Sequence, residues 1–344
     1  MAKTIRDIAR EAGVSVSTAS LAINGDSRVK PETRERIMQI ATSHGFRPSH
    51  AARSLSSGKS WSINVINPAV SSALTSGFST RFLHGVHEVA RAYRYTVSLT
   101  IIEDENEAVD ALDALALERA TDGVILMNPS ESGCVVEKLR ERGLPHTMLG
   151  RAPVPDVPSV DNDNVQVGYD AAAHLIEIGR FPIVFVSGPQ THTVTQDRLE
   201  GFYGAHRDYG LAPDDAPVVF SGKTAEDAFE DVSRLLAEDR PFRSVLAISD
   251  AQAIGAMRAV RSHGRRVPED VAIMGMNNDD LTAFTDPPMS SVELHAFELG
   301  RASVGLLLAQ IEGVYEPETR QIVDHELVIR GTTGFPEGSL EGNS

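Results

Sequence analysis

Short runs rich in Val and Ile alternate with helical patterns over most of this chain, and no other feature constrains its fold as strongly. The runs lie at 62–66, 96–102, 123–127, 145–149, 182–188, 218–220, 244–249 and 271–276. Helical patterns separate them, at 82–93, 108–117, 135–142, 165–178, 198–209, 225–237 and 252–263. Runs of β-branched residues with helical crossovers are typical of parallel sheets in α/β proteins.

The alternation restarts after Asp161, which divides the runs into two sets of four. Each set predicts one Rossmann-like lobe, and the two lobes together predict a ligand cleft at the carboxyl ends of their strands. A chain of 344 residues is long enough for two or three folding units, and 41% apolar and 23% charged residues are ordinary for a globular protein.

Charge is distributed unevenly along the chain. Residues 1–60 contain ten Lys and Arg against five Asp and Glu, a net charge of +5, whereas the whole chain carries −16 and the remainder therefore −21. A small basic segment joined to a large acidic one is expected when one module contacts a polyanion and the other keeps the protein in solution.

The single cysteine, Cys134, excludes an internal disulfide framework and suits a reducing compartment. The first residues, MAKTIRDIAREAG, lack the apolar core of a signal peptide, and no apolar run approaches the roughly 18 residues of a membrane span. We therefore expect a cytoplasmic protein without a membrane partner.

The basic segment contains three short helical patterns. Thr4 and Ser15 are suitable N-caps for the first two, and Pro31 begins the third. Gly13 ends the first helix and leaves only a short turn before the second, which is the arrangement of a helix-turn-helix. The inward positions of the three patterns are Ile5, Ile8, Ala9 and Ala12, then Ala19, Ala22 and Ile23, then Ile37, Ile40 and Ala41.

Any small three-helix bundle would show the same periodicity, so the exposed face of the second helix matters. Val16, Ser17, Ser20 and Leu21 are mostly short side chains that allow a helix to approach DNA bases in the major groove. The following stretch, RPSHAARSLSSGKS, is either a polar linker or a short basic helix from Ser49 to Leu55.

The stretches TIRDIAREAGVSVSTASLAING and VKPETRERIMQIATSHGFRPSHAARSL closely resemble the DNA-binding head and hinge of the lactose/galactose-repressor (LacI/GalR) family of bacterial transcription regulators. The resemblance implies that the second helix lies in the major groove. It also implies that a hinge helix forms on operator DNA and inserts an apolar pair into the minor groove, here Ala52 and Leu55. It assigns base contacts to Val16, Ser17 and Leu21, and mainly phosphate contacts to Thr4, Ser15, Ser20, Asn24 and Arg28.

Leu21 departs from the family pattern, because many members carry a guanine-reading arginine there. An apolar side chain cannot form that bidentate hydrogen bond and can only pack on a thymine methyl group or exclude it. We therefore expect an operator half-site different from the commonest one.

Residues 62–334 resemble the family's effector domain through VDNDNVQVGYDAAAHLIEIG, VFVSGP, QDRLEGF, LAISDAQAIGAMRA and VPEDVAIMGMNN. The implied fold is a multi-domain α+β protein, a lambda-repressor-like three-helix head followed by a two-lobed α/β periplasmic-binding-protein-like (Rossmann-like) domain. We expect a head at 1–47, a hinge at 48–60, an effector and dimerisation domain at 61–335 and a tail at 336–344. Lobe 1 would comprise about 61–161 and 291–320, and lobe 2 about 162–290 and 321–335.

The resemblance also implies effector-binding residues. Arg198 matches an arginine whose planar guanidinium holds vicinal hydroxyls or a carboxylate. Asn277 stands where an aspartate commonly accepts two sugar hydroxyls, and an amide can accept only one. The complete implied set is Phe78, Arg198, Lys223, Ser249, Asp250 and Asn277. The alternative to effector binding is packing in the core for Phe78 and an interlobe salt bridge for Arg198.

Other motifs do not support a second chemistry. Ser221–Thr224 resembles the end of a Walker A motif, but Pro217 replaces the required glycine, and residues 161–166 lack the glycine of a calcium loop. His84 and His87 have no third metal ligand in the sequence, and neither GxSxG nor HExxH occurs. We expect no enzyme activity, no metal and no cofactor.

The sequence predicts a homodimeric repressor of carbohydrate-uptake or catabolic genes. It would bind double-stranded pseudopalindromic operator DNA and leave it when a mono- or oligosaccharide enters the cleft. The alternatives are a corepressor-dependent regulator with a purine-like effector, a solute-binding protein without a DNA function, and an α/β enzyme that uses the cleft. The segment after Gly334, FPEGSLEGNS, contains no heptad repeat, so we do not expect a coiled-coil tetramer.

Overall fold

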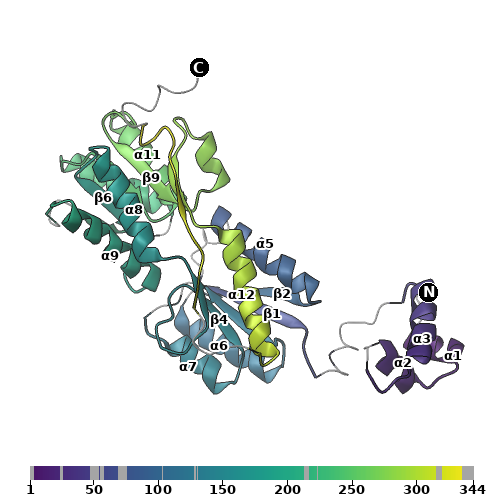
Figure 1. Ribbon diagram of the computed structural model, residues 1–344. Helices are drawn as coiled ribbons and strands as arrows, with labels where there is room; N and C mark the ends of the chain where they lie inside the picture. Colours follow the sequence, from purple (N-terminus) through teal and green to yellow (C-terminus); the bar gives the residue numbers. More distant parts are fainter. Residues whose placement is uncertain are drawn as a thin grey trace. The chain divides into compact units, whose positions relative to one another are not determined.

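The computed structural model describes residues 4–23, 26–46, 54, 58–68, 76–102, 104–127, 129, 131–212, 217–222, 224–314 and 320–334. The chain divides into two compact units, residues 1–61 and 62–344 (Figure 1). The expected hinge at 48–60 and residue 61, the expected start of the effector domain, both belong to the first unit. The expected hinge helix at Ser49–Leu55 lies outside the described residues, apart from Ser54.

The smaller unit is the predicted three-helix head. Its helices are α1 (Ile5–Glu11), α2 (Val16–Ile23) and α3 (Pro31–Ser43). Thr4 forms a capping box with Asp7, whose Oδ2 accepts from the Thr4 Oγ1 and N atoms at 2.7 and 2.9 Å. Ser15 caps α2 by accepting from Thr18 N at 3.0 Å. The buried core of the unit consists of Ile8, Ala9, Ala12, Ala19, Ala22, Val29, Ile37 and Ala41.

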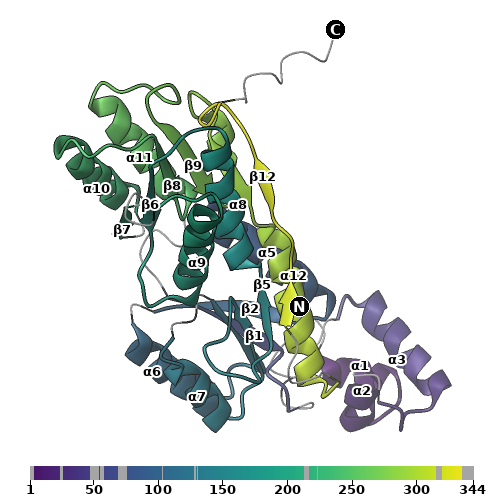
Figure 2. The same cartoon turned by 60° about the vertical axis from the view of Figure 1, so that its left-hand side comes forward.

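The larger unit contains two sheets, each the centre of one lobe, in agreement with the alternation in the sequence (Figure 2). The described strands of sheet 1 are all parallel and lie in the order β11-β5-β4-β3-β1-β2. Their bounds are β1 (Ser62–Pro68), β2 (Thr96–Ile102), β3 (Gly123–Met127), β4 (His146–Leu149), β5 (Ser159–Asp161) and β11 (Arg320–Ile322). The helices of this lobe are α5 (Gly77–Ala92), α6 (Glu105–Leu117), α7 (Cys134–Glu141) and α12 (Ala296–Ile311).

Sheet 2 has the order β12-β10-β9-β8-β6-β7, and only β12 is antiparallel to its neighbour. Its strands are β6 (Ile183–Ser187), β7 (Val218–Phe220), β8 (Ser244–Ala247), β9 (Ala272–Met276), β10 (Ser290–Glu293) and β12 (Glu326–Val328). The helices are α8 (Asn164–Glu177), α9 (Thr193–Asp208), α10 (Ala225–Ala237), α11 (Asp250–Ser262) and the 3₁₀-helix η2 (Asp280–Phe284).

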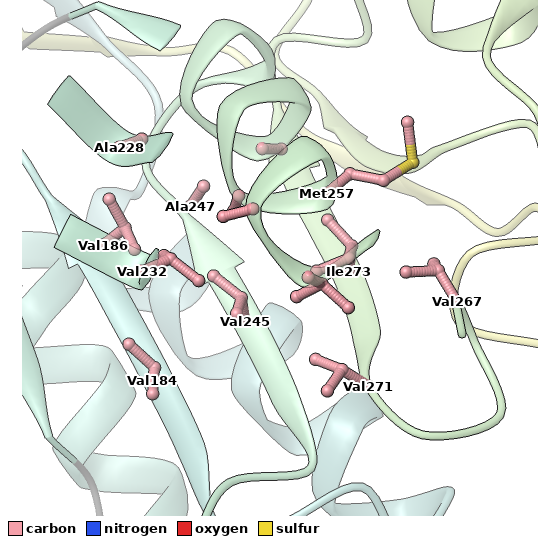
Figure 3. Packing of buried hydrophobic residues seen from close by; sticks show 14 of the residues in the cluster. Val184, Val186, Ala228, Val232, Val245, Ala247, Met257, Val267, Val271 and Ile273 are labelled. Carbon is pink, nitrogen blue, oxygen red and sulfur yellow. The ribbon is translucent and has the colours of Figure 1, made fainter. Parts of the chain in front are cut away.

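The face of sheet 2 beneath α10 and α11 has a largely aliphatic core. Figure 3 shows side chains from three neighbouring strands packed against the two helices. The labelled residues are Val184, Val186, Ala228, Val232, Val245, Ala247, Met257, Val267, Val271 and Ile273. Continuous apolar strands covered by helices account for the Val- and Ile-rich runs of the sequence.

The strand pairing locates two crossings of the chain between the lobes, which were expected at about 290 and 320. β10 pairs with β9 and β12 of sheet 2, so the chain returns to lobe 1 after Glu293 rather than at 291. β11 pairs with β5 of sheet 1, so the last crossing follows Ile322 rather than 320. Both strands are only three or four residues long, too short for a period that the sequence would reveal.

Helices α8 and α9 of lobe 2 cross at two glycines. A Cβ on Gly201 would lie 1.8 Å from the carbonyl oxygen of Val165, and one on Gly168 would lie 2.1 Å from that of Arg198. The backbones therefore touch directly, with no space for a side chain between them. This contact fixes the height at which α9 presents Arg198 to the cleft.

We predict that Gly201→Ala lowers the free energy of unfolding by more than about 2 kcal/mol, because a methyl group placed against backbone forces the helices apart. Gly204→Ala is the matched control on the same helix, since its Cβ would meet the Tyr169 ring at an ordinary 3.5 Å. Alanine favours a helix over glycine, so this control should be neutral or stabilising by up to about 1 kcal/mol. Urea unfolding of both variants measures the difference, and equal stabilities would contradict the backbone contact.

Candidate functional site

A cavity of about 290 Å³ lies between the two lobes of the larger unit. The carboxyl ends of strands from both sheets reach it, as is usual for ligand sites in open α/β sheets. Lobe 1 contributes Phe78 and Leu149, and lobe 2 contributes Ile248 and Ile254, so much of the wall is apolar.

The cavity brings together the described members of the predicted effector set. Phe78, Arg198, Ser249, Asp250 and Asn277 all line it, although they come from four separate stretches of the chain. Lys223, the sixth member, lies outside the described residues. Gly150 also lines the wall.

Arg198 is buried in the wall, with 6% of its surface exposed. Its Nε donates to Asn164 Oδ1 at 2.8 Å, and its Nη1 donates to the carbonyl oxygen of Ile248 at 3.1 Å. Burial lowers the pKa of its guanidinium to about 10, partly offset by nearby carboxylates, so it stays protonated at neutral pH. Both partners belong to lobe 2, so these bonds do not form the interlobe salt bridge that was the alternative interpretation.

Asp161 and Asn164 also line the cavity, although the sequence assigned neither of them an effector contact. Asn164 Nδ2 donates to Asp161 Oδ1 at 2.7 Å, which links that carboxylate through the amide to Arg198. Burial raises the pKa of Asp161 to about 6, against the opposing effect of Arg320. The sequence signal for these two residues is a cluster of acidic and amide side chains at the end of a strand. Through the two hydrogen bonds, Asp161 and Asn164 orient Arg198.

Asp250 lies at the other side of the cavity and is 1% exposed. Its Oδ1 accepts from Ser291 Oγ at 2.6 Å and its Oδ2 from Asp279 N at 2.7 Å. Burial raises the pKa of this carboxyl to about 7, although both hydrogen bonds favour the ionised form. Ser249 caps α11 and donates to Gln252 Oε1 at 2.8 Å. The start of that helix therefore holds both Ser249 and Asp250.

Phe78 occupies both positions that the sequence left open, the cavity wall and the edge of a core. It lines the cavity, and it also packs against the core of lobe 2 and stacks on Phe82 with ring centroids 6.4 Å apart. Phe78 belongs to α5 of lobe 1, so its packing against lobe 2 is an apolar contact between the lobes.

A salt bridge joins the lobes beside the cavity. The Nε and Nη2 atoms of Arg151, which follows β4, donate to the carboxylate of Asp197 on α9 at 2.8 to 3.0 Å. Gln196 Nε2 donates to Glu131 Oε2 at 2.6 Å across the same interface. A bidentate charged pair flanked by a further hydrogen bond stabilises the contact between the lobes.

The exposed face of α2 is the candidate DNA interface. Val16 and Ser17 are exposed and Ser20 is half-buried, while Ala19 and Ala22 on the opposite face are buried. Leu21 is half-buried against the core of the head, so only part of its side chain is available for a base contact.

The other predicted DNA contacts divide into two groups. Thr4 and Ser15 act as helix caps, and Arg28 is exposed with its guanidinium on Asp26, at 2.7 Å between Nη2 and Oδ2. Asn24, Ala52 and Leu55 lie outside the described residues.

Within the described ranges, no helix is long and apolar enough to cross a membrane. The same residues contain no group of three or more His, Cys, Asp or Glu side chains suited to a metal ion.

Comparisons with known proteins match both units. Residues 4–49 match the model of bacterial regulatory proteins of the lacI family, and residues 172–333 match that of the periplasmic binding protein-like domain. The HTH-type transcriptional repressor CytR of Escherichia coli (strain K12) is 30% identical over 337 residues, which cover 96% of each chain. The chain belongs to the lacI family.

Solved structures of lacI-family regulators share its fold. A complex of the transcriptional regulator CelR with cellobiose aligns with a TM-score of 0.74 and 27% identity, covering 96% of this chain and 99% of the other. The lac repressor dimer bound to operator and the anti-inducer ONPF aligns with a TM-score of 0.83 and 23% identity, covering 97% and 100%.

For this lacI-family protein we predict a pH-dependent contribution of Asp250 to stability. Its pKa is raised in the folded state, so folding binds a proton between pH 4 and 7, and stability falls as pH rises through that window. Asp250→Asn does not titrate and its amide can accept only one of the two hydrogen bonds, so it carries a cost that does not vary with pH. As the pH rises from 4 to 8, the difference in unfolding free energy should shift in favour of the variant by about a few kcal/mol.

Urea unfolding of both proteins at several pH values measures this difference and cancels the titration of other groups. A difference in unfolding free energy that is the same at pH 4 and pH 8 would contradict the buried, proton-binding carboxyl.

Proposed function

We propose that this lacI-family protein is a homodimeric, non-enzymatic repressor of carbohydrate-uptake or catabolic genes that acts in the cytoplasm. It binds a pseudopalindromic operator through α2 and the hinge, and a mono- or oligosaccharide in the interlobe cavity releases it. The observation that carries this proposal is the convergence of Arg198, Asn277 and Phe78 on one cavity in a unit separate from the basic head.

The head supports DNA binding by its charge and shape. Residues 1–60, the head with its hinge, carry a net charge of +5 that attracts phosphates, and the small exposed side chains of α2 allow close approach to the major groove. A single head contacts few base pairs, so specificity requires two copies on related half-sites. The lac repressor structure that shares this fold is a dimer on operator DNA.

The cavity supports a neutral polyhydroxylated effector. Arg198 is a fixed donor to hydroxyl oxygens, Asn277 can both donate and accept, and Phe78 offers an apolar surface for a sugar ring. The CelR structure contains cellobiose, which is consistent with a saccharide ligand. The volume of about 290 Å³ suits a small saccharide.

A corepressor-dependent regulator is the second candidate, because Phe78 could equally stack on a flat heterocycle such as a purine. The two candidates differ in the sign of the effect: a corepressor strengthens operator binding, whereas an inducer weakens it. A solute-binding protein without a DNA function does not require the basic three-helix head.

We predict that removal of residues 1–61 abolishes sequence-specific DNA binding and leaves effector affinity unchanged, because the two functions reside in separate compact units. The operator is first selected from random duplexes by the full chain, and its affinity is then compared for both proteins. A thermal-shift screen of mono- and disaccharides, with cellobiose included, identifies a ligand for the second comparison. Specific operator binding by residues 62–344 alone would contradict the proposal.

A further inference from the structure

A turn at the edge of the cavity is held by the opposite lobe. Residues 277–279 follow β9 in lobe 2, and Asn277 and Asp279 line the cavity. The Nη2 atom of Arg81, on α5 of lobe 1, donates to the carbonyl oxygens of Asn277 at 2.8 Å and Asn278 at 2.7 Å. Asp279 Oδ1 packs against the start of α5, where a Cβ on Gly77 would lie only 2.4 Å from it. The first turns of α5 therefore dock on this segment.

The backbone of the turn adopts a conformation that its residues disfavour. Asn277 has φ 111° and Asn278 has φ 50°, two consecutive residues in the region that Cβ-bearing side chains rarely occupy. Such a conformation persists only where surrounding groups hold it. Lobe 2 holds the amides: Asn278 N donates to Ser291 Oγ at 3.0 Å and Asp279 N to Asp250 Oδ2 at 2.7 Å. Lobe 1 holds the carbonyl oxygens through Arg81.

The charges around Arg81 reinforce the same geometry. Its Nη1 lies 3.4 Å from Glu293 Oε2, and its Nη2 lies 3.5 Å from Asp279 Oδ1. Glu293 also accepts from Asn278 Nδ2 at 2.9 Å and from His295 N at 2.8 Å, where the chain crosses back to lobe 1. Glu293 thus ties the turn to the crossing strand, and Arg81 ties both to α5.

We propose that Arg81 is a positioning residue for the effector: by bonding both carbonyl oxygens it fixes the left-handed turn that places Asn277 at the cavity. Because Arg81 belongs to lobe 1 and the turn to lobe 2, this support exists only while the two lobes are in contact here. The approach of the lobes and the placement of Asn277 are therefore coupled through this guanidinium. The effector role of Asn277 rests on the proposed function, whereas the support of the turn does not.

Hydrogen–deuterium exchange of the full chain without ligand, followed by mass spectrometry, tests the proposal. The readout is the exchange rate of peptides that cover the amides of residues 277–279. Arg81→Met keeps the aliphatic stem and removes the donors, and we expect these amides to exchange about tenfold faster, as for the loss of charged hydrogen bonds. Arg81→Lys keeps a cationic donor and should stay within about threefold of the original protein.

Two internal comparisons separate a local effect from general destabilisation. Arg91→Met changes an exposed arginine on the same helix and should leave the peptide unchanged. Peptides from β6 and α9 should exchange equally in all four proteins. Unchanged exchange at 277–279 in Arg81→Met would overturn the proposal, as would equal acceleration in Arg81→Met and Arg81→Lys, which would indicate a packing role.

Failure of the proposed function would be visible separately. If the full chain bound no operator and no saccharide, the repressor hypothesis would fall, while the exchange measurement would still report whether Arg81 holds the turn.

Discussion

The cleft depends on how one buried positive charge is accommodated. Arg198 is almost fully removed from water, and a guanidinium in that position is costly unless its donors and charge are compensated. Asn164 and the carbonyl oxygen of Ile248 take its hydrogen bonds, and Asp161 lies behind the amide as a nearby negative charge. The reciprocal glycine contact of α8 and α9 places both ends of this chain of bonds. Packing, electrostatics and ligand chemistry therefore meet at a single side chain.

Closure of the lobes places charged contacts on two flanks of the cavity. Arg151 and Asp197 pair on one side, and Arg81 bonds the turn at 277–279 on another. Each arginine comes from lobe 1 and each acceptor from lobe 2. A ligand that adds contacts to both lobes would stabilise this arrangement, and its effect would equal the difference between its affinities for the closed and open forms.

Much of the fold follows from the sequence because its signals are periodic. Continuous Val- and Ile-rich runs mark buried parallel strands, and the caps at Thr4 and Ser15 mark helix starts before any tertiary contact forms. The short strands β10 and β11 were not predicted, because three or four residues show no periodicity. Tertiary pairing determines which sheet each of them joins. Helix α9 starts at Thr193, five residues before the expected start at 198. The sequence did not predict this start because no side-chain cap precedes it.

The cavity residues were reached through a family resemblance, not through spacing. Phe78, Arg198, the pair Ser249 and Asp250, and Asn277 are far apart in the chain, and only the topology brings them to one wall. The sequence did not single out Asp161, Asn164 or Arg81. These residues bond other side chains or backbone atoms and belong to no recognisable motif. Their roles depend on distances across the crossing strands, and a linear pattern does not contain those distances.

The central claim is that a saccharide in the interlobe cavity controls DNA binding by the head. Fluorescence anisotropy of the selected operator duplex, with and without a saturating saccharide from the thermal-shift screen, measures it most directly. The account predicts that the saccharide weakens operator affinity by at least about tenfold, within the usual range of allosteric coupling. Arg198→Met, which loses the donors of the cavity, should show no such effect, whereas Arg207→Met changes an exposed arginine of the same helix and should retain it. An operator affinity that is unchanged or strengthened by every bound saccharide would contradict the account.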